Sequence, residues 1–310
     1  MLGPAVIVLR LLQFAGAMVL FGSSLFLLYA LPRVGVGSAH HLDWPRRLLA
    51  SAAGGVLIAS LLGLLAHTAI LAGSVAEGLK LESLSAVMTT MSMGPSTAVR
   101  ASAAALALVI LIARRPDSKS WWACAGAGAV ISASFAWMGH GAATEGPTGL
   151  LHLAGDILHT LAAGVWIGAL VAFLFLLRPR APSPELDAVL HKALHGFSGV
   201  GSALVGVLVA SGLVNSWFLV GPSRIVSLWT TPYGQLLSLK LALFGGMLLL
   251  AAANRFRLTP ALGAATTGDS SSSAKALAAL RRSLILETAL AVLVLGLVAW
   301  LGTLAPVSAQ

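Results

Sequence analysis

Long apolar runs alternate along this chain with short segments that hold most of its prolines and charged residues. A helix needs about 20 predominantly apolar residues to cross about 30 Å of hydrocarbon, and runs of this kind recur throughout the sequence. The pattern predicts an all-α fold, a polytopic bundle of eight transmembrane helices. We expect these helices at residues 8–31, 48–72, 96–113, 120–139, 149–177, 197–220, 234–253 and 283–304.

The breaks between the runs have physical causes. Proline lacks a backbone N–H and does least harm at the end of a helix. Four prolines fall at or close to run ends: Pro32, Pro116, Pro179 and Pro232. Segment 263–274, GAATTGDSSSSA, is predicted to be a flexible polar loop. We expect a single integral membrane domain over residues 1–310.

Composition supports a lipid environment. Of the 310 residues, 58% are hydrophobic and 9% are charged, whereas soluble domains carry about 25% charged residues. A bilayer removes the cost of exposing so much apolar surface to water. The single cysteine, Cys124, supports neither an internal disulfide nor a zinc site. The sequence contains no Walker, nucleophile-elbow or HExxH motif, so we do not expect an enzyme.

The basic residues indicate how the helices are oriented. With eight crossings, one face receives fourteen Lys and Arg residues and the other receives only Lys80 and Arg224. Cytoplasmic loops carry the excess, so we expect both termini to be extracytoplasmic. The net charge of +9 is spread between apolar runs, which argues against nucleic-acid binding. The fourteen are Arg33, Arg46, Arg47, Arg114, Arg115, Lys119, Arg178, Arg180, Lys192, Arg255, Arg257, Lys275, Arg281 and Arg282.

Three ionisable residues share one face of the fifth expected helix. His152, Asp156 and His159 stand at i, i+4 and i+7. Their directions fall within about 60° of one another, and the stripe spans about 10 Å along the axis. The expected topology places His140 just before this helix and His67 in the outer third of the second helix. Because ionisable groups inside a membrane are costly and usually functional, we expect these five residues to converge near the outer face.

This set of side chains suits a transition metal. Imidazole nitrogen is a good ligand for copper, zinc, iron and nickel. Asp156 would be a direct ligand, or it would accept the second ring proton of a histidine. For any single histidine, hydrogen bonding to a backbone carbonyl or a neighbouring helix is the alternative.

Three methionines lie on the same expected face, between the second and third helices. Met88, Met91 and Met93 form an MxxMxM segment. Thioether sulfur selects Cu(I) over hard cations, although methionine also serves as an adaptable packing residue. Beside the histidines, this segment favours copper.

Four further polar residues lie in or at the ends of apolar helices, and we expect them to form hydrogen bonds between helices. Lys240 and Glu287 enter from opposite faces, so no direct pair is expected between them. The four are Asn215, Lys240, Asn254 and Glu287.

Several short motifs occur in the second half of the chain. Three surround the histidine stripe: HGAA at 140–143, LHLAGDILH at 151–159 and AGVWIG at 163–168. The others are GLVNSW at 212–217, TPYGQLLSLK at 231–240, NRFRLTP at 254–260, Glu287 and LGTLAP at 301–306. In combination they resemble the CopD family of bacterial copper-resistance membrane proteins. The resemblance runs from about residue 130 to the end and is looser before that.

The resemblance implies eight helices in a bacterial inner membrane and a role in copper resistance, with copper moving from the periplasm toward the cytoplasm. It also implies a small periplasmic copper-binding partner of the CopC type. Only the quoted histidine and aspartate positions carry a metal role from the resemblance, and the methionines rest on their chemistry alone.

The leading hypothesis is a protein that binds periplasmic copper, as Cu(I) or Cu(II), and moves it into or across the membrane. Two alternatives stay open. Histidines on facing helices could ligate haem b in an electron carrier. A copper sensor or chaperone would bind the metal without moving it.

Overall fold

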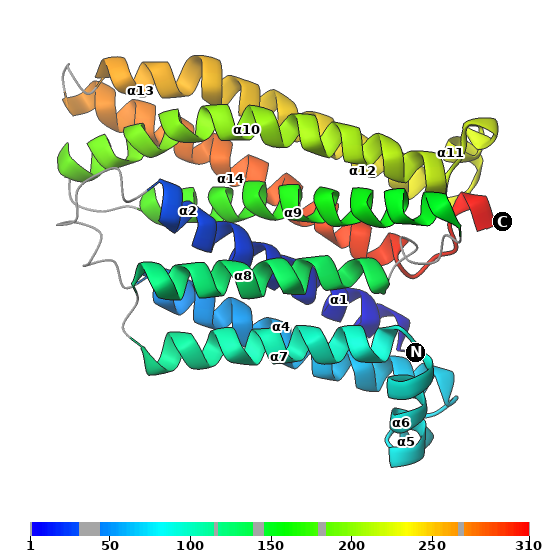
Figure 1. The fold of residues 1–310 in the computed structure, drawn as a ribbon. Coiled ribbons are helices and arrows are strands. Elements are labelled where there is room, and N and C mark those ends of the chain that lie inside the picture. Colours follow the sequence, from blue (N-terminus) through cyan, green and yellow to red (C-terminus); the bar gives the residue numbers. More distant parts are fainter. Residues whose placement is uncertain are drawn as a thin grey trace.

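The computed structural model describes residues 2–30, 44–114, 117–138, 146–178, 184–265 and 270–309. Within them the chain is helical and forms no strand. The long helices run side by side along the bundle (Figure 1). They are α1 (Gly3–Met18), α4 (Trp44–Leu71), α7 (Met93–Ala113), α8 (Ser118–Ser134), α9 (Pro147–Leu176), α10 (Pro184–Leu219), α12 (Pro232–Ala253) and α14 (Ser270–Leu301). Through π-helical turns, α2 (Ser24–Tyr29) continues α1 and α13 (Thr259–Ala265) continues α12. The short helices are α5 (Val75–Gly78), α6 (Leu81–Thr90) and α11 (Ser227–Thr230).

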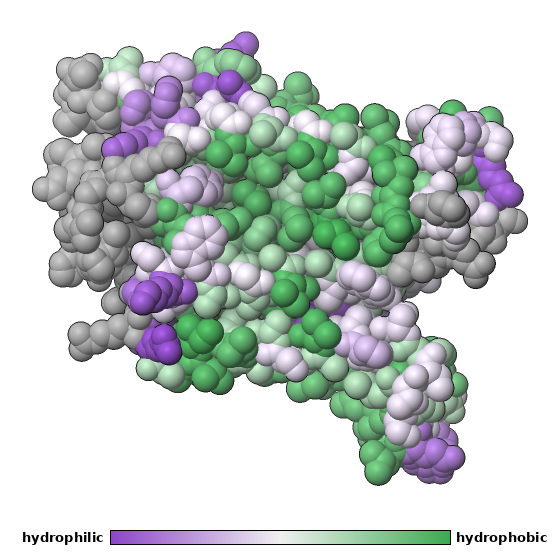
Figure 2. All heavy atoms as spheres, in the orientation of Figure 1, coloured by the Kyte–Doolittle hydropathy of each residue, from purple (hydrophilic) through white to green (hydrophobic). Residues whose placement is uncertain are grey.

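In the described part of the chain, 7 helices are long and apolar enough to cross a membrane. Figure 2 shows apolar residues across the middle of the visible face and hydrophilic residues toward its two ends. The 7 spans are Gly3–Tyr29, Trp44–Leu71, Met93–Ala113, Thr148–Leu176, Leu190–Leu219, Pro232–Ala264 and Ser272–Leu301. The expected helical, membrane-spanning architecture is confirmed, and each of the 7 overlaps one expected run.

The remaining expected run corresponds to α8, which is shorter, with 17 residues. Asp117 caps its start, because Oδ1 accepts from the Ser120 hydroxyl and backbone N–H at 2.6 and 2.7 Å. These bonds hold the pKa of the Asp117 carboxyl below its usual value. α8 packs against α7 and α2 inside the bundle. The N and C marks lie at the same end of the bundle (Figure 1).

Helices extend further than the apolar pattern indicated. α10 begins at Pro184 rather than near residue 197, and α14 begins at Ser270 rather than near 283. The prediction of a flexible loop over 263–274 is therefore wrong in its described part, where residues 263–265 end α13 and 270–274 begin α14. The apolar pattern marks only the part of a helix that lies in lipid, and serine is favoured at helix starts.

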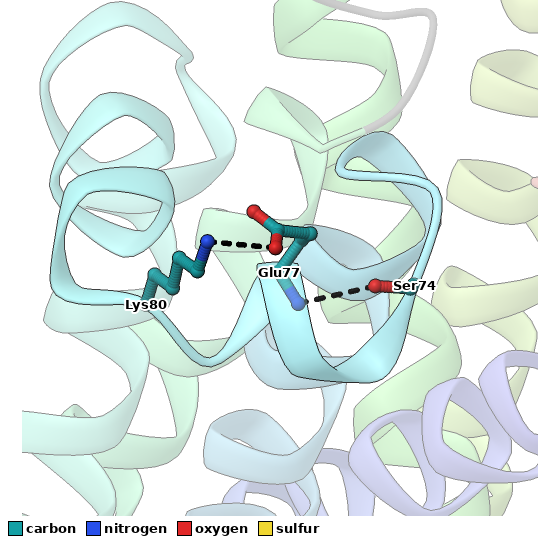
Figure 3. A network of polar contacts seen from close by, with 3 residues as sticks. All are labelled: Ser74, Glu77 and Lys80. Carbon is teal, nitrogen blue, oxygen red and sulfur yellow. Dashed lines mark hydrogen bonds and ion pairs between the residues drawn. The ribbon is translucent and has the colours of Figure 1, made fainter.

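The segment between α4 and α7 forms two short helices, α5 and α6. Ser74 caps α5 by accepting from the Glu77 backbone N–H at 3.1 Å, and Lys80 Nζ lies 2.7 Å from Glu77 Oε1 (Figure 3). Both charged side chains are exposed, so the ion pair adds little stability. Gly78 packs directly on the Ala69 backbone, which holds α5 against the end of α4.

A close helix crossing joins the turn between α1 and α2 to α9. The π-helical turn Val19–Ser23 links α1 to α2, and Gly22 lies against the Gly164 carbonyl and Gly168. The Ser23 hydroxyl donates to the Gly168 carbonyl oxygen at 2.8 Å. Small residues spaced by four let two backbones approach in a membrane, where packing drives association. This contact positions α9, and with it the histidine stripe, against the N-terminal helices.

Replacing Gly168 with alanine is expected to destabilise the protein by about 1–3 kcal/mol, because the new methyl group would overlap the backbone of Gly22 and Ser23. Gly126→Ala on α8 is the matched control, since a methyl group there meets open space. Thermal unfolding of the purified variants in detergent measures both. Equal stability of the two variants would show that the crossing tolerates an added methyl group.

Candidate functional site

A cavity of about 400 Å³ lies between α9, α10, α12, α14 and α1. Its walls form because α10 packs along α9 and α12 packs along α14, which leaves space between the two pairs. Most of the lining is apolar, and the polar side chains come mainly from α9, α10 and α12, with Arg10 from α1. They include Arg10, His152, Asp156, His159, Thr160, Asn215, Ser216, Tyr233 and Lys240. The expected stripe therefore faces one cavity with all three of its members.

A hydroxyl on α10 fixes the proton of His159. The Ser211 hydroxyl donates to the Val207 carbonyl oxygen at 2.6 Å, so its oxygen accepts from His159 Nδ1, which lies 3.0 Å away. In the neutral imidazole the proton then sits on Nδ1, and Nε2 keeps its lone pair. A metal-binding histidine is oriented in this way by its other ring nitrogen. His159 is thus prepared to act as a ligand.

Asp156 stands between an amide and a cation. Asn215 on α10 donates Nδ2 to Asp156 Oδ1 at 3.4 Å. Lys240 on α12 lies close enough for its charge to act on both Asp156 and His159, although the described residues show no salt bridge between Lys240 and Asp156. The buried Tyr233 lines the same space. Asp156 and Lys240 therefore line one cavity within range of each other's charge.

His152 lies at the N-terminal end of the stripe, and aromatic stacking holds its ring. Its side chain is only 2% exposed, and its ring stacks on Phe218 with 4.6 Å between centroids and 10° between planes. Stacking of this kind fixes the ring plane and so limits the directions from which a ligand or proton reaches its nitrogens.

The other expected ligands do not join this cavity. His67 on α4 lines a second, much smaller cavity with Met93, and its Nδ1 donates to the Gly63 carbonyl oxygen at 3.0 Å. Met88 lies on α6, and Met91 at its end is 41% exposed.

His140 lies outside the described residues, so its expected place near the stripe is untested. Within those residues, no group of three His, Cys, Asp or Glu side chains is arranged to hold a metal ion. Of the five residues expected to converge, His152, Asp156 and His159 share the large cavity, His67 does not line it, and the place of His140 is untested.

Deeper in the bundle, Glu287 joins three helices. The Trp166 indole N–H and the Asn254 amide each donate to its carboxylate at 2.8 Å, and Glu287 is 2% exposed. The expected hydrogen bonding between helices is confirmed for Asn254 with Glu287 and for Asn215 with Asp156.

Sequence reasoning gave no role to two arginines, Arg10 and Arg100. Arg10 lines both cavities, and Arg100 is fully buried beside the smaller one. The available signal was their position inside apolar runs, since an arginine in a membrane is costly.

The geometry bears on the haem hypothesis. Axial ligation needs two imidazoles that face each other across the macrocycle. The two described histidines of the large cavity lie on the same helix, α9. His67 lines the other cavity, and His191 and His195 on α10 line neither. The large cavity therefore offers no facing pair among its described histidines.

Comparison with known proteins agrees with the expected family. Residues 1–150 match the family model described as Copper resistance protein D-like, N-terminal domain, and residues 191–301 match the one described as Copper resistance protein D. A Copper resistance protein D from Pseudomonas syringae pv. tomato is 38% identical over 306 residues, which cover 98% of this chain and 97% of that protein.

Two other relatives match a smaller part. Copper transport protein CutJ of Bacillus subtilis (strain 168) is 36% identical over 118 residues, or 38% of this chain and 21% of that protein. Inner membrane protein YebZ of Escherichia coli (strain K12) is 35% identical over 127 residues, or 40% of this chain and 41% of that protein. No solved structure matches the chain. With the match over nearly the whole length, the chain belongs to the copper resistance protein D (CopD) family of multi-span helical membrane proteins.

Proposed function

We propose that this protein binds periplasmic copper in the large cavity and moves it into or across the inner membrane. One observation carries the proposal: in a chain of the CopD family, His152, Asp156 and His159 line one cavity, and His159 keeps a free Nε2 lone pair. A relative named Copper transport protein CutJ supports copper movement as the proposed activity. Copper is the cargo here, and no enzymatic step is proposed.

The proposal includes a topology. α8 serves as an eighth crossing, so that both termini lie outside the cytoplasm. The charge split of fourteen basic residues to two supports this orientation, as do termini that lie at one end of the bundle (Figure 1). The cavity then opens in the outer half of a single integral domain, where a periplasmic copper-binding protein of the CopC type would deliver the metal.

The ligands are proposed in two groups. His159 and His152 supply nitrogen, and Asp156 supplies a carboxylate oxygen or balances the charge of the ion. His140 is proposed to complete the site from the segment just before α9. A second group is proposed to capture copper first: His67, Met88, Met91 and Met93. The exposed Met91 suits this role better than His67, because the positive charges of Arg10 and Arg100 line the cavity of His67 and would repel a copper ion.

Alanine at both His152 and His159 is expected to lower copper affinity at least tenfold, because it removes two of the proposed nitrogen ligands. Isothermal titration of the purified protein with Cu(I), buffered by a competing chelator, measures affinity and stoichiometry. The matched control is His191→Ala with His195→Ala, two histidines on α10 that do not line the cavity. Unchanged affinity and stoichiometry in the His152/His159 variant would end the assignment.

Transport is tested separately from binding. Proteoliposomes loaded with a copper-sensitive dye are expected to show protein-dependent copper entry, which the His152/His159 variant loses. Copper binding of normal affinity without entry would instead assign the protein as a sensor or chaperone.

A further inference from the structure

A second polar cluster lies in the N-terminal half of the bundle, away from the histidine stripe. A small cavity of about 10 Å³ lies between α1, α4 and α7. Its lining includes the side chains of Arg10, Gln13, His67 and Arg100 and the sulfur-bearing Met93 and Met138. The lining contains no aspartate or glutamate, so the described residues place two guanidinium groups here without a carboxylate.

Arg100 is held by neutral groups alone. It is 0% exposed, and its guanidinium donates to Ser134 Oγ at 3.1 Å and to Gln13 Oε1 at 3.0 Å. A third contact joins Nη2 to Met138 Sδ at 2.7 Å, and the group lies 4.3 Å from the Phe135 ring centroid. Gln13 is itself fixed, because its Nε2 donates to the Ala59 carbonyl oxygen at 2.8 Å. These contacts fix the orientation of the Arg100 guanidinium, but none of them brings a negative charge to offset its positive charge.

Arg10 is less well satisfied. Its Nε is buried and has no hydrogen-bond partner among the described residues. The guanidinium lies against Gly302, the residue that follows α14, and 5.9 Å from the Phe14 ring centroid. An arginine keeps its charge in proteins, so a buried donor without a partner on this side chain calls for an acceptor that the described residues do not supply.

The nearby acids do not fill this need. Asp156 accepts a hydrogen bond from Asn215 and lies within range of the Lys240 charge. Glu287 takes its hydrogen bonds from Trp166 and Asn254. The charges of Arg10 and Arg100 do act on each other. Two like charges in a low-dielectric region repel strongly, and an anion between them adds two attractions that together outweigh this repulsion.

From these contacts we propose that the small cavity binds a monatomic monovalent anion of the chloride class, held between Arg10 and Arg100. The cavity has room for about one water-sized sphere. The flexible thioethers of Met93 and Met138 form part of its wall and can move by the few tenths of an ångström that a chloride ion requires. Polyatomic anions are too large. The anion offsets one of the two positive charges that Arg10 on α1 and Arg100 on α7 bring into the bundle. Arg10 also lines the large cavity and so connects the two sites.

The first test is thermal unfolding of the full-length protein in detergent, with chloride, bromide or gluconate at equal ionic strength. A ligand that binds only the folded protein raises the apparent melting temperature in a saturable way. Chloride and bromide are expected to do so, and gluconate is expected not to. Identical melting curves in chloride and gluconate would overturn the proposal.

Variants locate the effect. Arg10→Gln is the main variant, because Arg10 makes no hydrogen bond whose loss would unfold the described bundle. It is expected to weaken chloride binding by about tenfold or more, the effect of losing one charge-assisted contact. Arg281→Gln, on an exposed part of α14, is the matched control and is expected to keep the full chloride effect. A full chloride effect in Arg10→Gln would place the ion elsewhere and refute the site.

Anomalous diffraction from crystals grown in bromide gives an independent readout. A bromide peak between the two guanidinium groups is expected, and water without anomalous signal at this place contradicts the proposal. Neither measurement involves copper, so the result does not depend on the proposed transport function.

Discussion

Replacing Glu287 with leucine is expected to cost about 2–6 kcal/mol of stability. The carboxylate accepts one hydrogen bond from the Trp166 indole and one from the Asn254 amide, at a site that is 2% exposed. Leucine fills the space but leaves both donors buried without partners, and each such group costs about 1–3 kcal/mol. Asn254 Oδ1 is already without a partner among the described residues, so its amide would lose its remaining contact. Unfolding of the purified variant by titration with a denaturing detergent measures the loss.

Two further variants separate hydrogen bonding from packing at this site. Glu287→Gln keeps one acceptor oxygen and is expected to lose less stability than Glu287→Leu. Adding Trp166→Phe and Asn254→Leu to Glu287→Leu removes both orphaned donors, and most of the lost stability is expected to return. A triple variant as unstable as Glu287→Leu would show that packing, not the hydrogen bonds, accounts for the effect.

The sequence predicted the bundle well because lipid imposes a strong constraint. A spanning helix must be long and continuously apolar, and that requirement is visible without knowledge of the partners. The ends of α10 and α14 were missed because helices that continue past the membrane lose their apolar pattern there. Serine and glycine in 263–274 favour a loop in a prediction from sequence, although the described part of that segment is helical.

Part of the candidate site was also visible in the sequence. Residues at i, i+4 and i+7 share a face of any helix, so the common direction of His152, Asp156 and His159 follows from spacing alone. Which helices complete the cavity does not follow from spacing, since it depends on how the helices pack. The contacts of Ser211 with His159 and of Asn215 with Asp156 join α9 to α10, and neither pair shares a local pattern.

The separation of His67 from the stripe has the same origin. Topology gives the depth of a residue in the membrane, but it does not give the rotation of its helix. His67 and the stripe were both assigned to the outer half, yet α4 presents His67 to the small cavity beside Arg10. A prediction from depth alone therefore places His67 with His152, Asp156 and His159, although they line different cavities in the packed bundle.

Replacing Lys240 with leucine is expected to strengthen copper binding by about tenfold or more. Lys240 lines the same cavity as Asp156 and His159, and its charge acts on both. At a separation of about 7 Å and an effective dielectric constant of about 20, a unit positive charge opposes a Cu(I) ion by roughly 2 kcal/mol. Removing it also frees the Asp156 carboxylate to interact with the metal. Leucine is chosen because, unlike methionine, it adds no sulfur ligand.

The comparison with Asp156→Asn makes this result specific. Loss of the carboxylate leaves Lys240 as the uncompensated charge, so copper affinity is expected to fall in Asp156→Asn and to rise in Lys240→Leu. Lys119→Leu, an exposed residue at the start of α8, is the matched control and is expected to leave affinity unchanged. Competition titrations with a Cu(I) chelator measure all three. If Lys240→Leu bound copper no more tightly than the control, the ion would have to sit outside the reach of the Lys240 charge, and the cavity between α9 and α12 would lose its place in the proposed path.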